Sequence, residues 1–173
     1  MVTFILLLAV AGFAYYVHTQ PGSFRISRSL DINATPDAIF KHVNNLKLWD
    51  AWSPWAKLDP NATNSFSGPD AGVGAQMKWS GNMKVGVGGM TIVESEPSAR
   101  IQFRLDFEKP MRATNHAEFT FQPSGGQTLV VWSMTGTNNF VGKAMAIIMN
   151  CDKMLGGQFE QGLASLKRVS ESA

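Results

Sequence analysis

The chain has 173 residues and a net charge of +2; 16% of its residues are charged and 45% are hydrophobic. This length is enough for one domain whose core needs neither a metal nor a disulfide, and the single cysteine excludes an internal disulfide. No basic run is longer than the pair Lys167-Arg168. Nucleic-acid binding usually needs a clustered basic face, so we expect no nucleic-acid partner.

The N-terminal segment differs from the rest of the chain. Residues 2–17, VTFILLLAVAGFAYYV, carry no charge, and Tyr15 and Tyr16 suit the headgroup zone of a membrane. The segment is slightly shorter than the roughly 17–25 residues that span a bilayer, but its flanking residues extend it. We therefore expect residues 1–20 to form a single-pass N-terminal membrane anchor, on an undetermined side of the membrane. A cleaved signal peptide, which would lack its basic start, and a buried helix, which would lack a polar face, are the alternatives.

A strand and a helix follow. Residues 20–22, Gln-Pro-Gly, end the apolar segment, and residues 24–32 alternate between apolar and polar side chains, which predicts a half-buried strand. Thr35, Pro36 and Asp37 then form a helix start, because threonine caps, proline suits the first helical position and a carboxylate favours the positive end of the helix dipole. Apolar residues continue at helical spacing to about residue 46.

The stretch WDAWSPWAKLD, residues 49–59, contains three tryptophans within seven residues. We expect Trp49 and Trp52 to close one end of the core by packing a short helix on a sheet. Trp55 follows Pro54, which interrupts that helix. Its indole has an apolar body and a polar N–H, so it is expected to reach a pocket or the membrane interface.

From about residue 63, glycines at hairpin spacing separate short strands. Residues 100–108 alternate most clearly, and residues 113–122 and 128–136 extend the pattern. One apolar and one polar face on successive strands predicts an antiparallel sheet that is covered on one side only. The cover comes last, because apolar and small residues recur at three-to-four spacing from Phe140 to about Arg168, as one face of a long helix. These residues are Ile148, Leu155, Phe159, Gly162 and Leu166.

Residues for catalysis are few. The three histidines have no metal-ligand spacing to another ligand, so we predict no metal site, no cofactor and no catalytic residue. Glu94 and Glu96 share a predicted strand face with Met90 and Ile92. If that face is concave, a carboxylate lies in an apolar cavity, where it can act as a general acid or base. The favoured alternative places both glutamates at the solvated rim.

The aromatic side chains indicate ligand binding more strongly than the glutamates indicate catalysis. Several fall on the predicted concave face with no buried charge beside them, which suits an apolar small molecule, although a solid core would have the same pattern. The candidate ligand-binding residues are Trp55, Trp79, Phe103, Trp132 and Phe159.

Several stretches together resemble the SRPBCC superfamily (START-like, helix-grip), and in particular its polyketide cyclase/dehydrase-like branch. They are INATPDAIFKHVNNLKLWDAWSPWAKLD (32–59), GVGAQMKWSG (72–81), TIVESEPSARIQF (91–103), TLVVWSMTG (128–136) and FEQGLASLK (159–167). The resemblance implies an α+β helix-grip fold over residues 24–170, a curved antiparallel sheet of about seven strands around a long C-terminal helix. It also implies an apolar cavity between sheet and helix.

The resemblance implies no single activity, because lipid carriers, aromatase/cyclases and activators of a chaperone ATPase share the fold. We predict a membrane-tethered module that binds an apolar or aromatic small molecule or lipid, as a carrier or sensor. A cyclase or dehydratase that uses a cavity carboxylate, and a protein-interaction domain like the chaperone activators, are the alternatives. The sequence offers no convergent polar set, which favours binding over catalysis.

Overall fold

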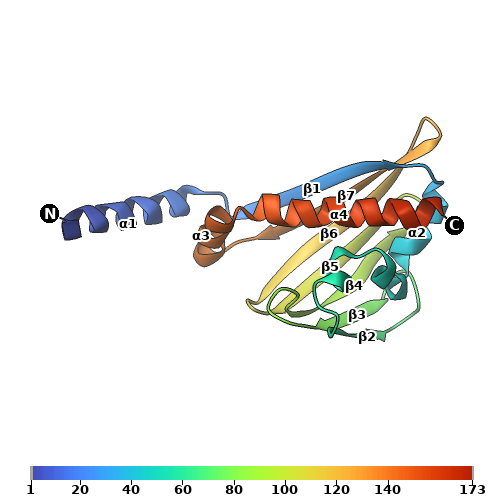
Figure 1. The fold of residues 1–173 in the computed structure, drawn as a ribbon, viewed down its shortest axis with the longest axis horizontal. Coiled ribbons are helices and arrows are strands. Elements are labelled where there is room, and N and C mark those ends of the chain that lie inside the picture. The colour runs from blue at the N-terminus through green and yellow to red at the C-terminus, as the bar shows by residue number, and fades with distance from the viewer. Residues whose placement is uncertain (1, 173) are drawn as a thin grey trace.

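The computed structural model describes residues 2–172, and its largest element is a seven-stranded antiparallel sheet. The strands lie in the order β1-β7-β6-β5-β4-β3-β2. Figure 1 shows the sheet curving around the long helix α4 (Cys151–Glu171), so the predicted helix-grip fold is confirmed. The strands are β1 (Ser23–Ile32), β2 (Thr63–Ser67), β3 (Gln76–Ser80), β4 (Val87–Glu96), β5 (Arg100–Lys109), β6 (Ala113–Ser124) and β7 (Gln127–Thr137).

Three short helices connect β1 to β2: α2 (Pro36–Asn44), η1 (Leu46–Ala51) and η2 (Pro54–Lys57). The α2 helix begins as predicted, because the Thr35 hydroxyl accepts a hydrogen bond from the Ala38 N–H at 3.3 Å. The tryptophan stretch forms two 3₁₀ helices. The first ends at Ala51 and the second begins at Pro54, where the sequence predicted an interruption.

Trp49 and Trp52 close one end of the core, as predicted. They are only 6% and 1% exposed. Their indole N–H groups donate to the carbonyls of Val43 at 2.9 Å and His42 at 3.2 Å, near the end of α2. Trp49 also meets Phe103 edge-on, with ring centroids 5.4 Å apart. These contacts hold η1 against both α2 and the concave face of the sheet.

The predicted C-terminal helix is divided in two. The helix α3 (Phe140–Met149) ends at Asn150, which has a left-handed φ of 46°, and α4 begins immediately after it. Asn150 also caps α4, because its side chain accepts from the Lys153 N–H. Asparagine tolerates this backbone conformation and caps helices well. Ile148 belongs to α3 and is 68% exposed, so the apolar stripe that covers the sheet begins at Leu155 and not at Ile148.

The N-terminal helix α1 (Val2–Thr19) extends away from the sheet (Figure 1). Among the described residues, no helix is long and apolar enough to cross a membrane. The prediction of a single-pass membrane anchor over residues 2–17 is therefore wrong. The helix has 18 residues, which corresponds to about 27 Å at about 1.5 Å per residue, less than the roughly 30 Å of a bilayer's hydrocarbon core. Its last two residues, His18 and Thr19, are also polar.

Candidate ligand-binding cavity

A cavity of about 160 Å³ lies between the sheet, the tryptophan stretch and the first turns of α4. All five residues predicted from the sequence to bind a ligand line it, and they come from five different elements: η2, β3, β5, β7 and α4. They are Trp55, Trp79, Phe103, Trp132 and Phe159. The structure brings them together around one space, and their contact with a ligand stays a prediction.

The base of the cavity is a stack of aromatic rings. Trp132 lies between Phe119 and Phe159, with centroid distances of 4.7 and 4.2 Å and interplanar angles of 28° and 9°. Trp55 meets the edge of this stack, 5.6 Å from Trp132. A Cβ atom on Gly162 would lie 2.6 Å from the Trp132 ring, so the glycine is what lets α4 pack directly on the indole. Trp132 and Phe159 are 3% and 1% exposed, and a ligand can touch little more than their edges.

The opposite wall is built around Trp79 on β3. Its ring is half-buried and meets Phe107 edge-on at 5.8 Å. Trp79 is paired with Gly88 of β4, and a Cβ atom at Gly88 would lie 2.6 Å from the Trp79 ring. The indole therefore lies flat across the backbone of β4. More of its surface is free than that of Trp132, which makes it the larger aromatic contact for a ligand.

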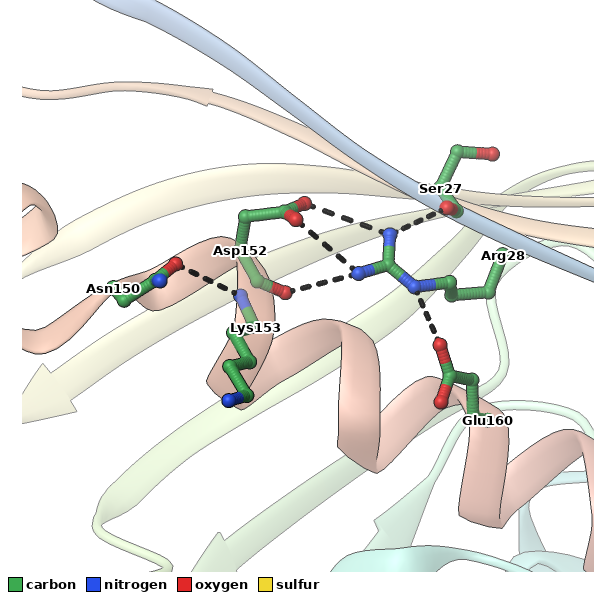
Figure 2. A network of polar contacts seen from close by, with 6 residues as sticks. All are labelled: Ser27, Arg28, Asn150, Asp152, Lys153 and Glu160. Atoms are coloured by element: carbon green, nitrogen blue, oxygen red, sulfur yellow. Dashed lines mark hydrogen bonds and ion pairs between the residues drawn. The ribbon is translucent and has the colours of Figure 1, made fainter.

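A polar network fixes the wall that α4 contributes (Figure 2). The Arg28 guanidinium donates to the Asp152 carboxylate at 3.2 Å, the Glu160 carboxylate at 2.9 Å and the Ser27 carbonyl at 2.8 Å. The hydrogen bonds to Asp152 and then to Glu160 raise the pKa of Arg28. A Cβ atom on Gly156 would overlap the guanidinium. The network thus joins the first turns of α4 to β1.

The same turns of α4 carry Leu155 and Phe159 into the cavity. The Arg28 network therefore holds the turns of α4 that carry these two side chains against β1. Nothing in the sequence pattern pointed to Arg28 as the side chain that takes the space beside Gly156.

One edge of the cavity is polar. It consists of Asp50 from η1, Ser53 from the turn before η2, and Asn64 from β2. The Asn64 amide donates to Asp50 Oδ1 at 3.2 Å. Asp50 and Asn64 are exposed and Ser53 is half-buried, so this edge is the rim where the cavity meets solvent. These residues were not predicted from the sequence; the available signal was the place of Asp50 between two tryptophans that face the sheet.

Glu94 and Glu96 do not enter the cavity. The register of β4 and β5 shifts between Ile92 and Glu94, which turns both glutamates to the outer face of the sheet. There they accept hydrogen bonds from Arg100 at 2.6 and 3.0 Å. The hypothesis that they share the concave face of Ile92 is wrong, and the alternative that placed them in solvent is closer to the structure.

The structure also gives no support for a metal site, a catalytic histidine or a nucleophilic cysteine among the described residues. Within residues 2–172, no group of three or more His, Cys, Asp or Glu side chains could hold a metal ion. His116 is exposed on the outer face of β6. Burial raises the pKa of the Cys151 thiol, and because the thiolate is the nucleophilic form, this disfavours a reactive cysteine.

Comparison with known proteins agrees with the fold. The model of the polyketide cyclase/dehydrase and lipid transport family matches residues 23–171, which supports the resemblance noted in the sequence. No curated protein matches the chain significantly. Protein CV1439 from Chromobacterium violaceum is 18% identical, with a TM-score of 0.60 over 88% of this chain and 99% of that one.

Two further solved structures are similar. Protein MLL2253 from Mesorhizobium loti is 14% identical, with a TM-score of 0.61 over 87% of this chain and 98% of that one. The Aha1 dimer from Colwellia psychrerythraea is 18% identical, with a TM-score of 0.57 over 83% of this chain and 93% of that one. At these identities the likeness concerns the fold alone.

Proposed function

We propose that this chain, which belongs to the polyketide cyclase/dehydrase and lipid transport family, binds an apolar or aromatic small molecule between its sheet and α4 without converting it. The observation that carries the proposal is the cavity itself. Side chains from η2, β3, β5, β7 and α4 converge on one space and present carbon-rich surfaces to it. Concave sites with a mostly aromatic and aliphatic lining are typical of binding sites for apolar ligands.

The size of the cavity limits which ligands fit inside it. Its volume of about 160 Å³ is similar to that of an engineered apolar cavity of about 150 Å³ that binds benzene. An apolar body of one or two rings, or a short chain, matches this space. A larger molecule would have to extend past the rim at Asp50 and Asn64 into solvent.

The position of the acidic residues favours binding over conversion. The enzyme alternative depended on a carboxylate inside the cavity, and Glu94 and Glu96 are on the outer face, bonded to Arg100. Among the described lining residues, Asp50 is the one carboxylate, and it is exposed at the rim. An exposed carboxylate lacks the apolar surroundings that tune such groups for acid–base catalysis.

Fluorescence titration of the full chain with N-phenyl-1-naphthylamine, a neutral probe, tests the proposal. We expect saturable binding with a blue-shifted emission. Trp79→Ala should weaken it about tenfold, because an aromatic contact and its buried area together contribute about 1.4 kcal/mol. Phe66→Ala is the matched control, since Phe66 is an exposed aromatic residue on β2 outside the cavity. Both variants keep α1, so probe that binds to that apolar helix contributes equally.

Equal binding by the wild type and Trp79→Ala would contradict the proposal and would move a protein-interaction role ahead of it. Mass spectrometry of the recovered ligand tests the second half of the claim. Unchanged mass after prolonged incubation with naphthalene-based ligands is expected, and a new product that depends on the folded protein would show that the cavity is catalytic.

A further inference from the structure

We infer that the ligand has a hydrogen-bond donor, a protonated amine or a hydroxyl, at the end that reaches the rim of the cavity, and that carboxylates are disfavoured. The inference rests on the proposed function and adds the chemical class of the ligand. It comes from the way charge is distributed around the cavity rather than from the shape of the apolar interior.

Among the described residues that line the cavity, charge is present at one place. Within the described part of the chain, no lysine, arginine or histidine lines the cavity, and Asp50 is its one charged residue. Ser53 and Asn64 are the other polar side chains there, and all three lie on the same rim. A ligand whose apolar body fills the interior must therefore direct any polar group toward this rim, since a polar group left among the aromatic rings would lose its hydrogen bonds with water.

The hydrogen bonds at the rim leave acceptor capacity open. An ionised carboxylate is only an acceptor, with about four lone-pair sites, and the Asp50 carboxylate receives one side-chain bond, from Asn64. The Ser53 hydroxyl makes no capping bond to η2, so it can both donate and accept. A ligand hydroxyl or ammonium group finds acceptors here, whereas a ligand carboxylate would meet a like charge.

Neighbouring charges do not reverse this preference. Lys57 and Lys84 adjoin lining residues in the sequence, but both are exposed and neither lines the cavity. The other nearby carboxylate, Asp59, is buried, and it accepts the backbone N–H groups of Asn61 at 3.0 Å and Asn82 at 2.7 Å. Asp59 is therefore used in the structure of the loops, and Asp50 remains the charge that a ligand meets.

Three ligands with the same naphthalene body test the inference: 2-naphthylmethylamine, 2-naphthalenemethanol and 2-naphthoate. At pH 7 they carry a positive charge, no charge and a negative charge. We expect the amine to bind the full chain at least about fivefold more tightly than the carboxylate in low salt, near the upper range for an exposed ion pair. The ratio should shrink in about 0.5 M NaCl, because salt screens exposed charges.

Asp50→Asn should bring the ratio of amine to carboxylate affinity close to one, because it removes the charge from the rim. Asp37→Asn is the matched control, because it removes the same charge from an exposed site at the start of α2, where the carboxylate pairs with Lys41. It should leave the ratio unchanged.

Failure of the proposed function and failure of this inference give different results. If the alcohol fails to bind the wild type, the proposed function fails. If the alcohol binds but the carboxylate equals or exceeds the amine, or if Asp50→Asn and Asp37→Asn have the same effect on the ratio, the inference about the ligand's polar end is overturned and the proposed function stands. The wild-type ratio is itself decisive, so the test does not depend on the folding of the variants.

Discussion

Two of the tryptophans that line the cavity, Trp132 and Trp79, differ in how much of each ring is free. Trp132 is stacked on both faces, by Phe119 and Phe159. Trp79 is half-buried and lies across the backbone of Gly88. Truncating Trp132 would remove the centre of the core, which typically costs about 3–5 kcal/mol. Trp79 is therefore the residue whose substitution separates ligand binding from folding.

Glycines of α4 allow a sharper test of the packing at Trp132. Gly162→Ala should lower the free energy of unfolding by about 1–3 kcal/mol, because its new methyl group would crowd the Trp132 ring and Pro54. Gly157→Ala is the control on the same helix, where an added Cβ meets nothing within 4 Å. It should be neutral or stabilising by up to about 1 kcal/mol, the difference in helix propensity. Urea unfolding measures both, and equal effects would show that α4 does not pack on Trp132 as described.

The helix α4 is held at both ends by polar contacts with β1 and the residue that follows it. Asp152 in its first turn and Glu160 near its middle bond to Arg28. At its end, the Glu171 carboxylate accepts from the Asn33 N–H at 2.7 Å and pairs with Lys167 at 2.7 Å. The hydrogen bond from Lys167, and next that from Asn33, lower the pKa of Glu171 from its ordinary value of 4.5.

That lowered pKa predicts how stability changes with acid. Above pH 4.5 the carboxylate is ionised in both folded and unfolded chains, so its contribution is fully present; it is lost as the pH falls through the folded pKa. Glu171→Gln should therefore lower the thermal midpoint at pH 7, and the difference from wild type should shrink below pH 4. Glu108→Gln, at an exposed carboxylate near the end of β5, is the control that removes one carboxylate elsewhere on the surface. A Glu171→Gln difference that stays constant from pH 7 to pH 3 would contradict this assignment.

Two elements show why sequence patterns predicted the sheet but not all of its faces. Strict alternation over residues 100–108 predicted the orientation of β5, and Ile101 and Phe103 are fully buried as expected. In β4 the alternation is broken by one extra residue near Val93, so every later side chain changes face. A bulge depends on the pairing of two strands, which a count along one strand does not reveal.

The C-terminal helices that cover the sheet were likewise predicted only in part. The apolar spacing from Phe140 onward favoured one continuous helix, and only the backbone conformation of Asn150 separates α3 from α4. Asparagine is compatible with both a helix interior and a left-handed cap, so composition did not distinguish them.

The apolar run at the N-terminus predicted a membrane span, whereas no described helix is long and apolar enough to cross a membrane.

For the whole molecule, the sequence predicted the apolar part of the candidate site better than its polar part. Aromatic residues on the apolar face of an alternating strand face the core. The three predicted residues on strands therefore reach the cavity, together with Trp55 of η2 and Phe159 of α4. Asp50, Ser53 and Asn64 gave no comparable signal, because polar residues in short helices and edge strands are ordinarily solvated. They become a rim only when η1 and β2 are brought side by side by the fold, as the bond from Asn64 to Asp50 records.

The central claim is that an apolar ligand enters the space between the sheet and α4. Titration of the ¹⁵N-labelled full chain with 2-naphthalenemethanol, followed by NMR, tests it most directly. We predict saturable shifts of the Trp55 and Trp79 indole N–H signals and of the backbone amides of Leu155 and Phe159, all from residues that line the cavity. Amides of the outer Arg100 network should remain unchanged. Shifts confined to α1 and α3, with the cavity signals unmoved at saturating ligand, would contradict the account.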